Sequence, residues 1–362
     1  MLPPLKIGDL VAKLPFVQGG MGVGVSLSGL ASAVANEGGV GVISAAIIGF
    51  AESDLYTNYR QANIRALRRE IRKARELTKG ILGVNIMVAL TNFSDMVRTA
   101  VEEGIDVIFC GAGLPLDLPE LVSAQARSKL VPIVSSARAA KVICKRWLAR
   151  FERLPDAFVL EGPLAGGYLG FSRDQVEDPS YSLPKLLRQL MEVIRPFEQD
   201  RGAKLPIIAA GGIYSGQDIS DMLDQGAAGV QMGSRFVTTY ECDADIKFKQ
   251  AYMEAQERDL VLIDSPVGLP GRSLRNAFLE EVSQGKKRPV KCPFHCLVTC
   301  KQKESPYCIA NALINAVRGR LERGFAFAGQ NAFRSQKLVS VKCLIDGLLE
   351  EFRQANPSPR LG

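Results

Sequence analysis

The chain has 362 residues, of which 47% are hydrophobic and 23% are charged, and its formal net charge at pH 7 is +7. These values are ordinary for a globular protein that buries a large core, as one big domain or as one domain plus a smaller unit. No run of about 18 apolar residues occurs, and the N-terminus lacks the pattern of a signal peptide, so a membrane span and export are excluded and a cytoplasmic protein is expected.

Short apolar runs that end in glycine or small polar residues recur along the first two thirds of the chain. In order they are Phe16–Gln18, Val40–Ser44, Gly83–Met87, Asp106–Cys110, Pro132–Ser135, Ala157–Glu161, Pro206–Ala210 and Gly229–Met232. Helix-length amphipathic stretches, such as Ser94–Glu103 and Gln217–Gln225, lie between most of them. Strands that alternate with helices pair in parallel through crossover connections.

Eight such units in about 240 residues match a closed (β/α)8 barrel, the TIM barrel of the α/β class, in number and size. A doubly wound open sheet is the alternative. That fold would carry one glycine fingerprint after its first strand, whereas this chain has glycine turns after several strands.

The ends of the seventh and eighth strands carry glycine turns, Ala210–Ile213 and Gly233–Arg235. In (β/α)8 barrels the active site lies at the C-terminal ends of the strands, and the last two loops commonly hold a phosphate. Glycine N–H groups can point at an anion with no Cβ in the way. We therefore expect a phosphate on Gly211, Gly212, Gly233 and Ser234, with Arg235 adding charge or forming a salt bridge.

Five segments taken together resemble the nitronate monooxygenase (2-nitropropane dioxygenase) family, which also includes the FMN-dependent enoyl-acyl-carrier-protein reductases of the second type. They follow one another in the right order between residues 15 and 240, and are Gln18–Met21, Gly83–Met87, Glu161–Gly167, Pro206–Ile213 and Gly226–Phe236. The resemblance implies an oxidoreductase with a non-covalent FMN. It implies cofactor contacts at Gln18, Gly19, Gly20, Met21, Asn85, Glu161, Ala165, Gly166, Gly167, Ala210, Gly211, Gly212, Gly233 and Ser234.

Tyr168 stands where members of this family usually carry a histidine that faces the flavin. In nitronate oxidation that histidine looks like the proton-handling group, and its near-neutral pKa suits the role. A tyrosine, with a reference pKa near 10, is a poor base at pH 7 but an adequate hydrogen-bond donor or acid. Tyr168 is therefore the candidate catalytic residue of a reduction, and an aromatic wall of the pocket is the alternative.

The substrate is expected to be a small or carrier-bound organic molecule. Two activities of the family remain as alternatives, namely nitronate-type oxidation with O₂ and reduction of an activated C=C bond as in enoyl thioesters. No separate Gly-x-Gly-x-x-Gly fingerprint of a dinucleotide-binding domain occurs at the start of a helix. The reductases of the family use a nicotinamide without such a domain, so this absence decides little. The electron donor is either NADH or NADPH, or an electron-transfer protein. The sequence also leaves open whether the protein forms a homodimer. A non-redox barrel that binds a phosphorylated metabolite is a further alternative, but the strand ends lack a lysine or paired carboxylates.

The positive charge is densest at residues 60–79 and at Lys286, Lys287, Arg288 and Lys291. A basic surface attracts any anion. We interpret the first group as the solvated face of a helix, so nucleic acid is not an expected partner. An RNA-associated flavoprotein is a further alternative, and only the positive charge supports it.

Four of the eight cysteines are clustered late in the chain, at Cys292, Cys296, Cys300 and Cys308. On a helix the first three would lie on one face. Four thiolates this close in sequence can hold a [4Fe–4S] cluster, or a zinc ion with all four cysteines or with three of them plus His295. We favour iron–sulfur, because structural zinc sites usually place their ligands as close pairs separated by a longer arm. Packing of small apolar thiols is the remaining interpretation.

The other four cysteines, Cys110, Cys144, Cys242 and Cys343, are isolated in sequence and are expected to be buried thiols. Three parts of the chain are expected. Residues 1–245 form the FMN-binding barrel, and residues 246–335 form a cap over the barrel mouth with the candidate metal site. Residues 336–362 form a final helix, Val339–Phe352, and a loose tail from Gln354.

Overall fold

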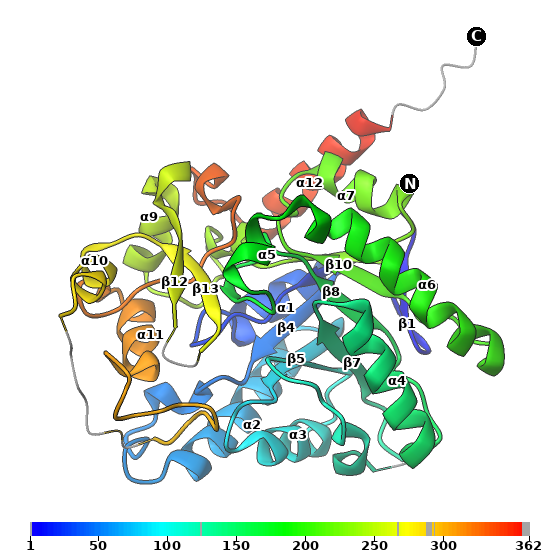
Figure 1. Cartoon of the computed structure of the whole chain (residues 1–362), viewed down its shortest axis with the longest axis horizontal. Helices are drawn as coiled ribbons and strands as arrows, with labels where there is room; N and C mark the ends of the chain where they lie inside the picture. The colour runs from blue at the N-terminus through cyan, green and yellow to red at the C-terminus, as the bar shows by residue number, and fades with distance from the viewer. Residues whose placement is uncertain (1, 124, 266–267, 287–291, 293, 357–362) are drawn as a thin grey trace.

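The protein is described here by a computed structural model that covers residues 2–123, 125–265, 268–286, 292 and 294–356. Figure 1 shows a barrel with helices around it and a later part of the chain at one side. The strands are β1 (Leu5–Ile7), β2 (Leu10–Ala12), β3 (Phe16–Gln18), β4 (Val40–Ser44), β5 (Ile81–Met87), β6 (Val107–Gly111), β7 (Lys129–Val134), β8 (Phe158–Glu161), β9 (Gly167–Tyr168), β10 (Ile207–Ala210), β11 (Gly229–Met232), β12 (Leu260–Asp264) and β13 (Pro270–Leu274).

The helices of the described residues alternate with these strands and then continue beyond the barrel. They are α1 (Ser28–Asn36), α2 (Tyr59–Leu77), α3 (Phe93–Glu102), α4 (Ala137–Phe151), α5 (Arg173–Glu177), α6 (Leu183–Arg201), α7 (Gly216–Asp224), α8 (Ser234–Val237), α9 (Ile246–Glu254), α10 (Ala277–Ser283), α11 (Ile309–Val317) and α12 (Val341–Ala355). Short 3₁₀ helices lie at Ile48–Ala51, Leu118–Leu121, Pro179–Tyr181, Glu257–Asp259, Leu321–Arg323 and Ala332–Arg334.

Parallel strands close into a barrel in the order β10-β11-β3-β4-β5-β6-β7-β8. The strands are apolar on both faces because side chains fill the barrel interior on one side and helices cover the other. All five residues of β4, for example, are buried. The predicted (β/α)8 barrel is therefore confirmed, and the open-sheet alternative is wrong.

The N-terminal hairpin β1–β2, which the sequence pattern did not reveal, packs against the barrel interior. Its Leu5, Ile7 and Ala12 are buried in one cluster with side chains from inside the barrel such as Val17 and Phe109. In (β/α)8 barrels the active site lies at the opposite face, at the C-terminal ends of the strands. The hairpin therefore closes the face of the barrel that contributes to stability.

The helix boundaries follow local capping chemistry. Helix α4 begins after Ser136, whose hydroxyl accepts a hydrogen bond from the N–H of Ala139. Helix α7 begins with a capping box formed by Ser215 and Asp218. The sequence-based ranges for α3 and α7 are each displaced by one residue from the observed ones.

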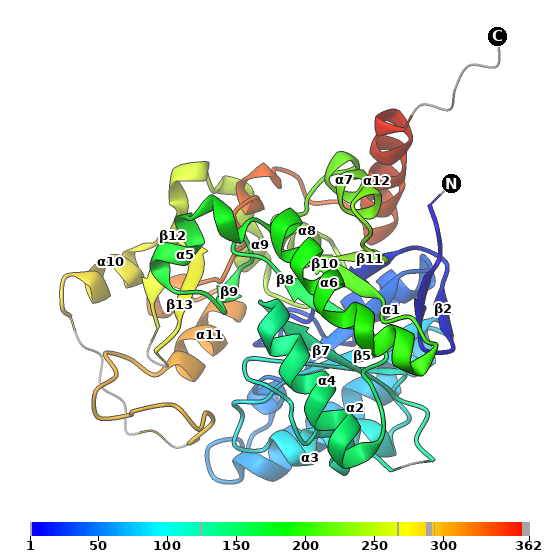
Figure 2. The same cartoon turned by 45° about the vertical axis from the view of Figure 1, so that its right-hand side comes forward.

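Beyond the barrel, the chain forms a second, antiparallel sheet in the order β12-β13-β9. This sheet joins residues 260–274 to the segment that follows β8, because Tyr168 pairs with Gly271 and Gly167 pairs with Arg272. Figures 1 and 2 both show α12 returning to lie beside α7. Helix α12 extends to Ala355, three residues further than predicted, and most of the expected tail, residues 357–362, lies outside the described residues.

The basic face of α2 is paired with acidic neighbours. Arg60 contacts Asp95, Arg68 contacts Glu102, and Arg72 contacts Glu103 at 2.7 Å. These ion pairs agree with a solvated helix surface. In the second basic group, residues 287–291 lie outside the described part of the chain, and Lys286 contacts Glu281 at 3.0 Å. No helix among the described residues is long and apolar enough to cross a membrane.

Candidate active site

A cavity of about 480 Å³ opens at the C-terminal ends of the barrel strands. This volume lies within the range of small-molecule and cofactor sites. Almost all of the predicted cofactor residues line it: Gly19, Gly20, Met21, Asn85, Glu161, Ala165, Gly166, Gly167, Ala210, Gly211, Gly212, Gly233 and Ser234. Tyr168 also lines it. Residues from the ends of five strands, β3, β5, β8, β10 and β11, which are far apart in sequence, are therefore brought to one site.

Gln18 is the predicted contact that the structure does not bring to the cavity. Its side chain is fully buried. Its Nε2 donates to the carbonyl oxygens of Gly19 and Val42, at 2.6 and 3.2 Å, and its Oε1 accepts from the N–H of Val42 at 3.0 Å. Both ends of the amide thus join β3 to β4, which leaves neither of them directed at a ligand.

The turn after β10 requires glycine at two consecutive positions. Gly211 and Gly212 have φ values of +94° and +87°, in the left-handed region that side chains disfavour. A Cβ on Gly211 would lie 2.8 Å from the carbonyl oxygen of Gly162, and one on Gly212 would lie 2.9 Å from the side chain of Leu164. The backbone of this turn is therefore open to a ligand and cannot be replaced without strain.

Residues 327–331, called the strap below, tie the glycine turns together. The N–H of Gly329 donates to the Ser234 hydroxyl at 2.8 Å, and the N–H of Gln330 donates to the carbonyl of Leu164 at 3.0 Å. The side-chain amide of Asn331 donates to the carbonyl of Gly212 at 2.5 Å. The strap thus fixes three loops of the barrel against one another.

Sequence reasoning placed the strap near the barrel mouth but did not identify Gln330 and Asn331 as residues of the site. The only available signal was the run of glycine, aromatic and amide residues from Gly324 to Asn331. Nothing local in that run specifies hydrogen bonds to residues about 100 positions earlier in the chain.

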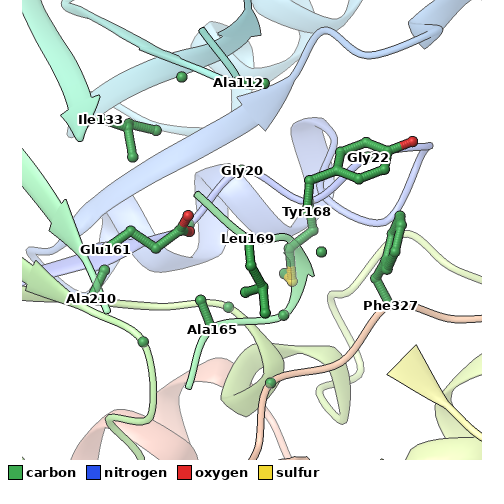
Figure 3. A pocket seen from close by; sticks show the side chains of 18 of the residues that line it. Gly20, Gly22, Ala112, Ile133, Glu161, Ala165, Tyr168, Leu169, Ala210 and Phe327 are labelled. Carbon is green, nitrogen blue, oxygen red and sulfur yellow. The ribbon is translucent and has the colours of Figure 1, made fainter. Parts of the chain in front are cut away.

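Asn85 and Glu161 are half-buried polar side chains of the cavity wall, and neither has a hydrogen-bond partner among the described residues. In Figure 3 the Glu161 carboxyl points into the cavity from the end of β8. Burial raises the pKa of Glu161 to about 7. A buried polar group without a partner is costly, so both groups are suited to bind a ligand.

Arg235 directly follows the glycine turn after β11, Gly233–Ser234, but forms no salt bridge with the described residues. Its guanidinium stacks over the ring of Tyr214 at 4.3 Å and donates to the Tyr214 hydroxyl at 3.1 Å. Arg334 covers the same ring at 4.4 Å. The expected barrel-end ion pair is replaced by this stacked group.

The Tyr168 ring lies across the cavity from Glu161, with its hydroxyl directed away from that carboxyl (Figure 3). Burial raises the pKa of Tyr168 above its ordinary value of 10, and the charges of Tyr307, Cys296 and Cys300 add to the rise. The phenol is therefore protonated throughout the neutral range and can act as a donor but not as a base.

Arg272 on β13 holds the turn that leads to Tyr168. Its guanidinium is buried and donates to the carbonyl oxygens of Pro163 and Ala165, at 2.6 and 2.8 Å. Burial lowers the pKa of Arg272 to about 10, and no carboxylate of the described residues pairs with it. A buried cation is thus kept in place by backbone oxygens of the cavity wall.

The described residues around Cys296 and Cys300 form a loop and not the helix that would place the first three cysteines on one face. The backbone of this loop forms hydrogen bonds with the loop after β5. The N–H of Val298 donates to the carbonyl oxygen of Ala89, and the N–H of Thr91 donates to the carbonyl oxygen of Cys296. Leu297 forms a bridge with Leu90, and both side chains line the cavity. A backbone committed to these partners cannot form helical hydrogen bonds.

The four clustered thiols lie within electrostatic range of one another. Burial raises the pKa of Cys296 to about 12, and the thiols of Cys308, Cys292 and Cys300 add to the rise. Among the described residues, however, no three cysteine, histidine or carboxylate side chains are grouped so as to hold a metal ion. Of the isolated cysteines, Cys110, Cys144 and Cys242 are buried as expected, whereas Cys343 is exposed because it lies on the outer face of α12.

A closed barrel with a cavity at its strand ends, walled by glycine turns, defines a (β/α)8-barrel enzyme. The sequence model of one family, nitronate monooxygenase, matches residues 4–351. The chain therefore belongs to the nitronate monooxygenase family and is an oxidoreductase.

Individual relatives are distant. The chain is 28% identical over 273 residues to a Mycobacterium tuberculosis (3aS,4S,5R,7aS)-5-hydroxy-7a-methyl-1-oxo-octahydro-1H-indene-4-carboxyl-CoA dehydrogenase, covering 75% of this chain and 66% of that one. It is 24% identical to a "probable nitronate monooxygenase" of Staphylococcus haemolyticus, covering 95% and 96%. Its fold superposes on FabK from Thermotoga maritima with a TM-score of 0.73, 27% identity, and coverage of 95% and 94%.

Proposed function

We propose that the protein is an FMN-dependent oxidoreductase that reduces an activated C=C bond in an apolar substrate, such as an enoyl thioester, either small or bound to a carrier. The observation that carries this proposal is the place of Tyr168 in the cavity wall, across from Glu161, at the position where the family usually has a histidine. The name of the M. tuberculosis relative, a carboxyl-CoA dehydrogenase, is in line with a thioester substrate.

The residues of the cavity fit FMN. The turns at Gly211–Gly212 and Gly233–Ser234 offer backbone N–H groups to a single phosphate, and Ser234 begins the short helix α8. Asn85 and Glu161 supply the unpartnered polar groups that the rest of the cofactor needs. Gly19, Gly20 and Met21 also line the cavity, and the two glycines leave the backbone there open to a ligand.

The residues that surround the site have separate roles. FMN, when bound, would supply the exchange of a hydride or electrons with the substrate. Tyr168 would donate a hydrogen bond or proton to the substrate carbonyl or to the carbon that becomes saturated. The apolar walls formed by Leu297, Ile309 and Leu313 would hold the hydrocarbon part of the substrate and exclude water.

Nitronate oxidation is the second candidate, because relatives in the family carry that name. Any proton transfer from a neutral nitroalkane would need a base, and the Tyr168 phenol is not a base at neutral pH. The test is to assay an enoyl thioester and a nitronate with the unaltered protein and with Tyr168→His. We expect the unaltered protein to reduce the thioester and the variant to gain nitronate oxidation. Strong nitronate oxidation by the unaltered protein, insensitive to the substitution, would overturn the reductive assignment.

We also propose that Cys292, Cys296, Cys300 and Cys308 hold a [4Fe–4S] cluster, with zinc as the alternative. Several features support this proposal. The N–H of His295 donates to the Cys292 sulfur at 3.4 Å, and Cys308 lies at the N-terminus of α11, where the N–H groups of Asn311 and Ala310 oppose the rise in its pKa that burial causes. Such donors favour a thiolate ligand.

A buried hydroxyl without a partner lies next to these thiols. The Tyr59 hydroxyl has no hydrogen-bond partner among the described residues. The Tyr59 ring packs against Phe294 of the cysteine loop, with 5.9 Å between the centroids, and its pKa is raised by burial first and then by Cys296 and Cys292. A sulfur-rich ligand on the cysteines would give this hydroxyl an acceptor. Because the thiols are not grouped for a metal as they stand, binding would require the loop 292–300 to close around it.

Elemental analysis of anaerobically purified protein tests this metal assignment. We expect iron and acid-labile sulfide, both lost when any one of the four cysteines is changed to alanine, since metal binding and local folding are linked. Cys343→Ala is the matched control and should keep them. Protein containing neither iron nor zinc would refute the site, and zinc without iron would select the alternative.

A further inference from the structure

Helix α4 begins at the cavity mouth and covers β7 on the outside of the barrel. We infer that its outward face is the docking surface for an acidic carrier protein that presents the acyl thioester to the cavity. This inference rests on the proposed function, and it selects the carrier-bound form of the substrate over the free one.

Helix α4 carries positive charge only. Its basic residues are Arg138, Lys141, Lys145, Arg146 and Arg150, and its range contains no aspartate or glutamate. Arg146 and Arg150 contact acidic side chains of the segment after β6, at 2.8 to 3.0 Å. The other three, called the α4 stripe below, are exposed and form no salt bridge with the described residues. Their charge is therefore free to meet a negative partner.

The α4 stripe lies along one face of the helix. Arg138, Lys141 and Lys145 follow one another at spacings of three and four residues, which places them in a row on one side. Val142 lies on the same side and is 40% exposed. At a rise of 1.5 Å per residue, the row is about 10 Å long. The surface thus combines a line of positive charge with an apolar contact.

The N-terminal end of the stripe adjoins the cavity. Ala139, in the first turn of α4, lines the cavity, and Arg138 directly precedes it. Helix α4 also packs on the loop after β6, since Nε1 of Trp147 donates to the carbonyl oxygen of Pro115 at 3.0 Å. Leu114 of this loop lines the cavity and is 41% exposed. A partner that binds the stripe therefore lies beside the cavity opening.

Helix α6 packs against α4 and enlarges the positive surface, and Figures 1 and 2 both show the two helices side by side. Lys185 and Arg188 of α6 are exposed and form no salt bridge with the described residues. Two exposed acidic residues, Asp178 before α6 and Glu192 within it, offset part of this charge. The α4 stripe is therefore the most strongly positive part of the surface.

Helix α2 shows how the chain treats basic residues that need no external partner. Arg60, Arg68 and Arg72 of that helix are all paired with acidic side chains of α3 or of the residue that follows it. On α4 the like charges are spaced at three and four residues, where they repel one another. An acidic partner protein would relieve this repulsion.

The length of the stripe decides among the anionic partners. The nucleotide of a coenzyme A thioester at the mouth could contact Arg138 but would leave Lys145, about 10 Å further along the helix, unpaired. Nucleic acid is favoured by exposed aromatic rings that stack on bases, but Trp147 of α4 is buried and Phe151 is half-buried. An acidic protein can cover the whole row, and the charge also speeds its encounter.

The experiment compares one acyl group on two carriers. A trans-2-hexenoyl group is presented to the holoprotein on a bacterial acyl carrier protein, which is acidic, and on N-acetylcysteamine, which is uncharged. For the carrier protein, the double variant Arg138→Glu, Lys141→Glu should raise KM by about tenfold or more. For the N-acetylcysteamine thioester it should change neither KM nor kcat. Lys73→Glu, at an exposed and unpaired position of α2, is the matched control and should change nothing.

Fluorescence anisotropy of the labelled carrier protein measures binding without turnover, and added salt should weaken it. Equal effects of the double variant on both thioesters, or none on either, would overturn the inference. So would binding of single-stranded RNA in place of the carrier protein, lost in the same variant. If the unaltered protein reduced neither thioester, the proposed function would fail, and loss of carrier binding in the double variant would still support the surface.

Discussion

The ring of Tyr168 packs edge-on against the ring of Phe327, with 5.2 Å between the centroids and 65° between the planes. Phe327 belongs to the strap, and Tyr168 follows the glycine turn after β8. The hydroxyl of Tyr252 donates to the carbonyl of Phe327, which fixes the strap from behind. The orientation of the candidate catalytic side chain is therefore determined by residues about 160 positions later in the chain.

Replacing Tyr168 by phenylalanine keeps this ring contact and removes only the hydroxyl. If the phenol donates a proton or hydrogen bond to the substrate, reductive turnover should fall by about 10²–10⁴-fold. Bound flavin should be unchanged, because the proposed cofactor contacts are backbone groups of other loops. Steady-state assays beside Tyr240→Phe, an exposed control, test this. Unchanged turnover would show that Tyr168 is only a wall of the pocket.

Gly212→Ala should weaken flavin binding. Its φ of +87° is strained for alanine, and the new Cβ would meet Leu164 at 2.9 Å. Strain of about 1–3 kcal/mol corresponds to roughly a tenfold or greater rise in the dissociation constant. The control is Gly347→Ala in α12, where a Cβ meets no atom within 4 Å. Equal flavin retention by the two variants in ultrafiltration would argue against a phosphate site at this turn.

Glu161→Gln should change how stability depends on pH. Folding raises the pKa of this carboxyl from 4.5 to about 7. Between these values the folded chain holds a proton that the unfolded chain has lost, so stability falls as the pH rises through this window. The cost is complete above pH 7 and is on the order of 3 kcal/mol.

In flavin-free protein, the melting temperature of Glu161→Gln should therefore exceed that of the unaltered chain at pH 8 and approach it near pH 4. Glu192→Gln, at an exposed position of α6, is the control and should show no such trend. A difference between Glu161→Gln and the unaltered chain that does not vary with pH would mean that the carboxyl is not desolvated.

Arg272→Met should destabilise the turn before Tyr168, because the carbonyl oxygens of Pro163 and Ala165 lose their donor. Hydrogen bonds to a charged group are worth about 1.5–3 kcal/mol each. We expect a lower melting temperature and lower turnover, partly restored by Arg272→Lys. Arg173→Met removes exposed contacts with Asp264 and with the carbonyl of Leu262, and should change neither the melting temperature nor the turnover. Unaltered melting in Arg272→Met would show that the guanidinium does not support the turn.

The barrel was predictable because its strands are short apolar runs closed by glycine, and that pattern is local. The glycine turns at Gly211–Gly212 and Gly233 were predictable for the same reason. The role of Gln18 was not predictable, because its amide could hydrogen-bond to a ligand or to a neighbouring strand. Only the closed barrel brings Val42 within hydrogen-bond distance of this amide. The strap and Arg272 act through contacts about 100 residues distant, which no local pattern encodes. Gly167–Tyr168 became a strand only because β13 lies beside it.

The most direct test of the central claim is the identity of the released cofactor. Protein purified without added flavin should be yellow, and heating should release FMN in about one equivalent per chain, identified by chromatography against FMN and FAD standards. The single phosphate site that we propose at the turns after β10 and β11 predicts FMN. Release of FAD, or of no flavin from folded protein that also fails to bind added FMN, would contradict the account.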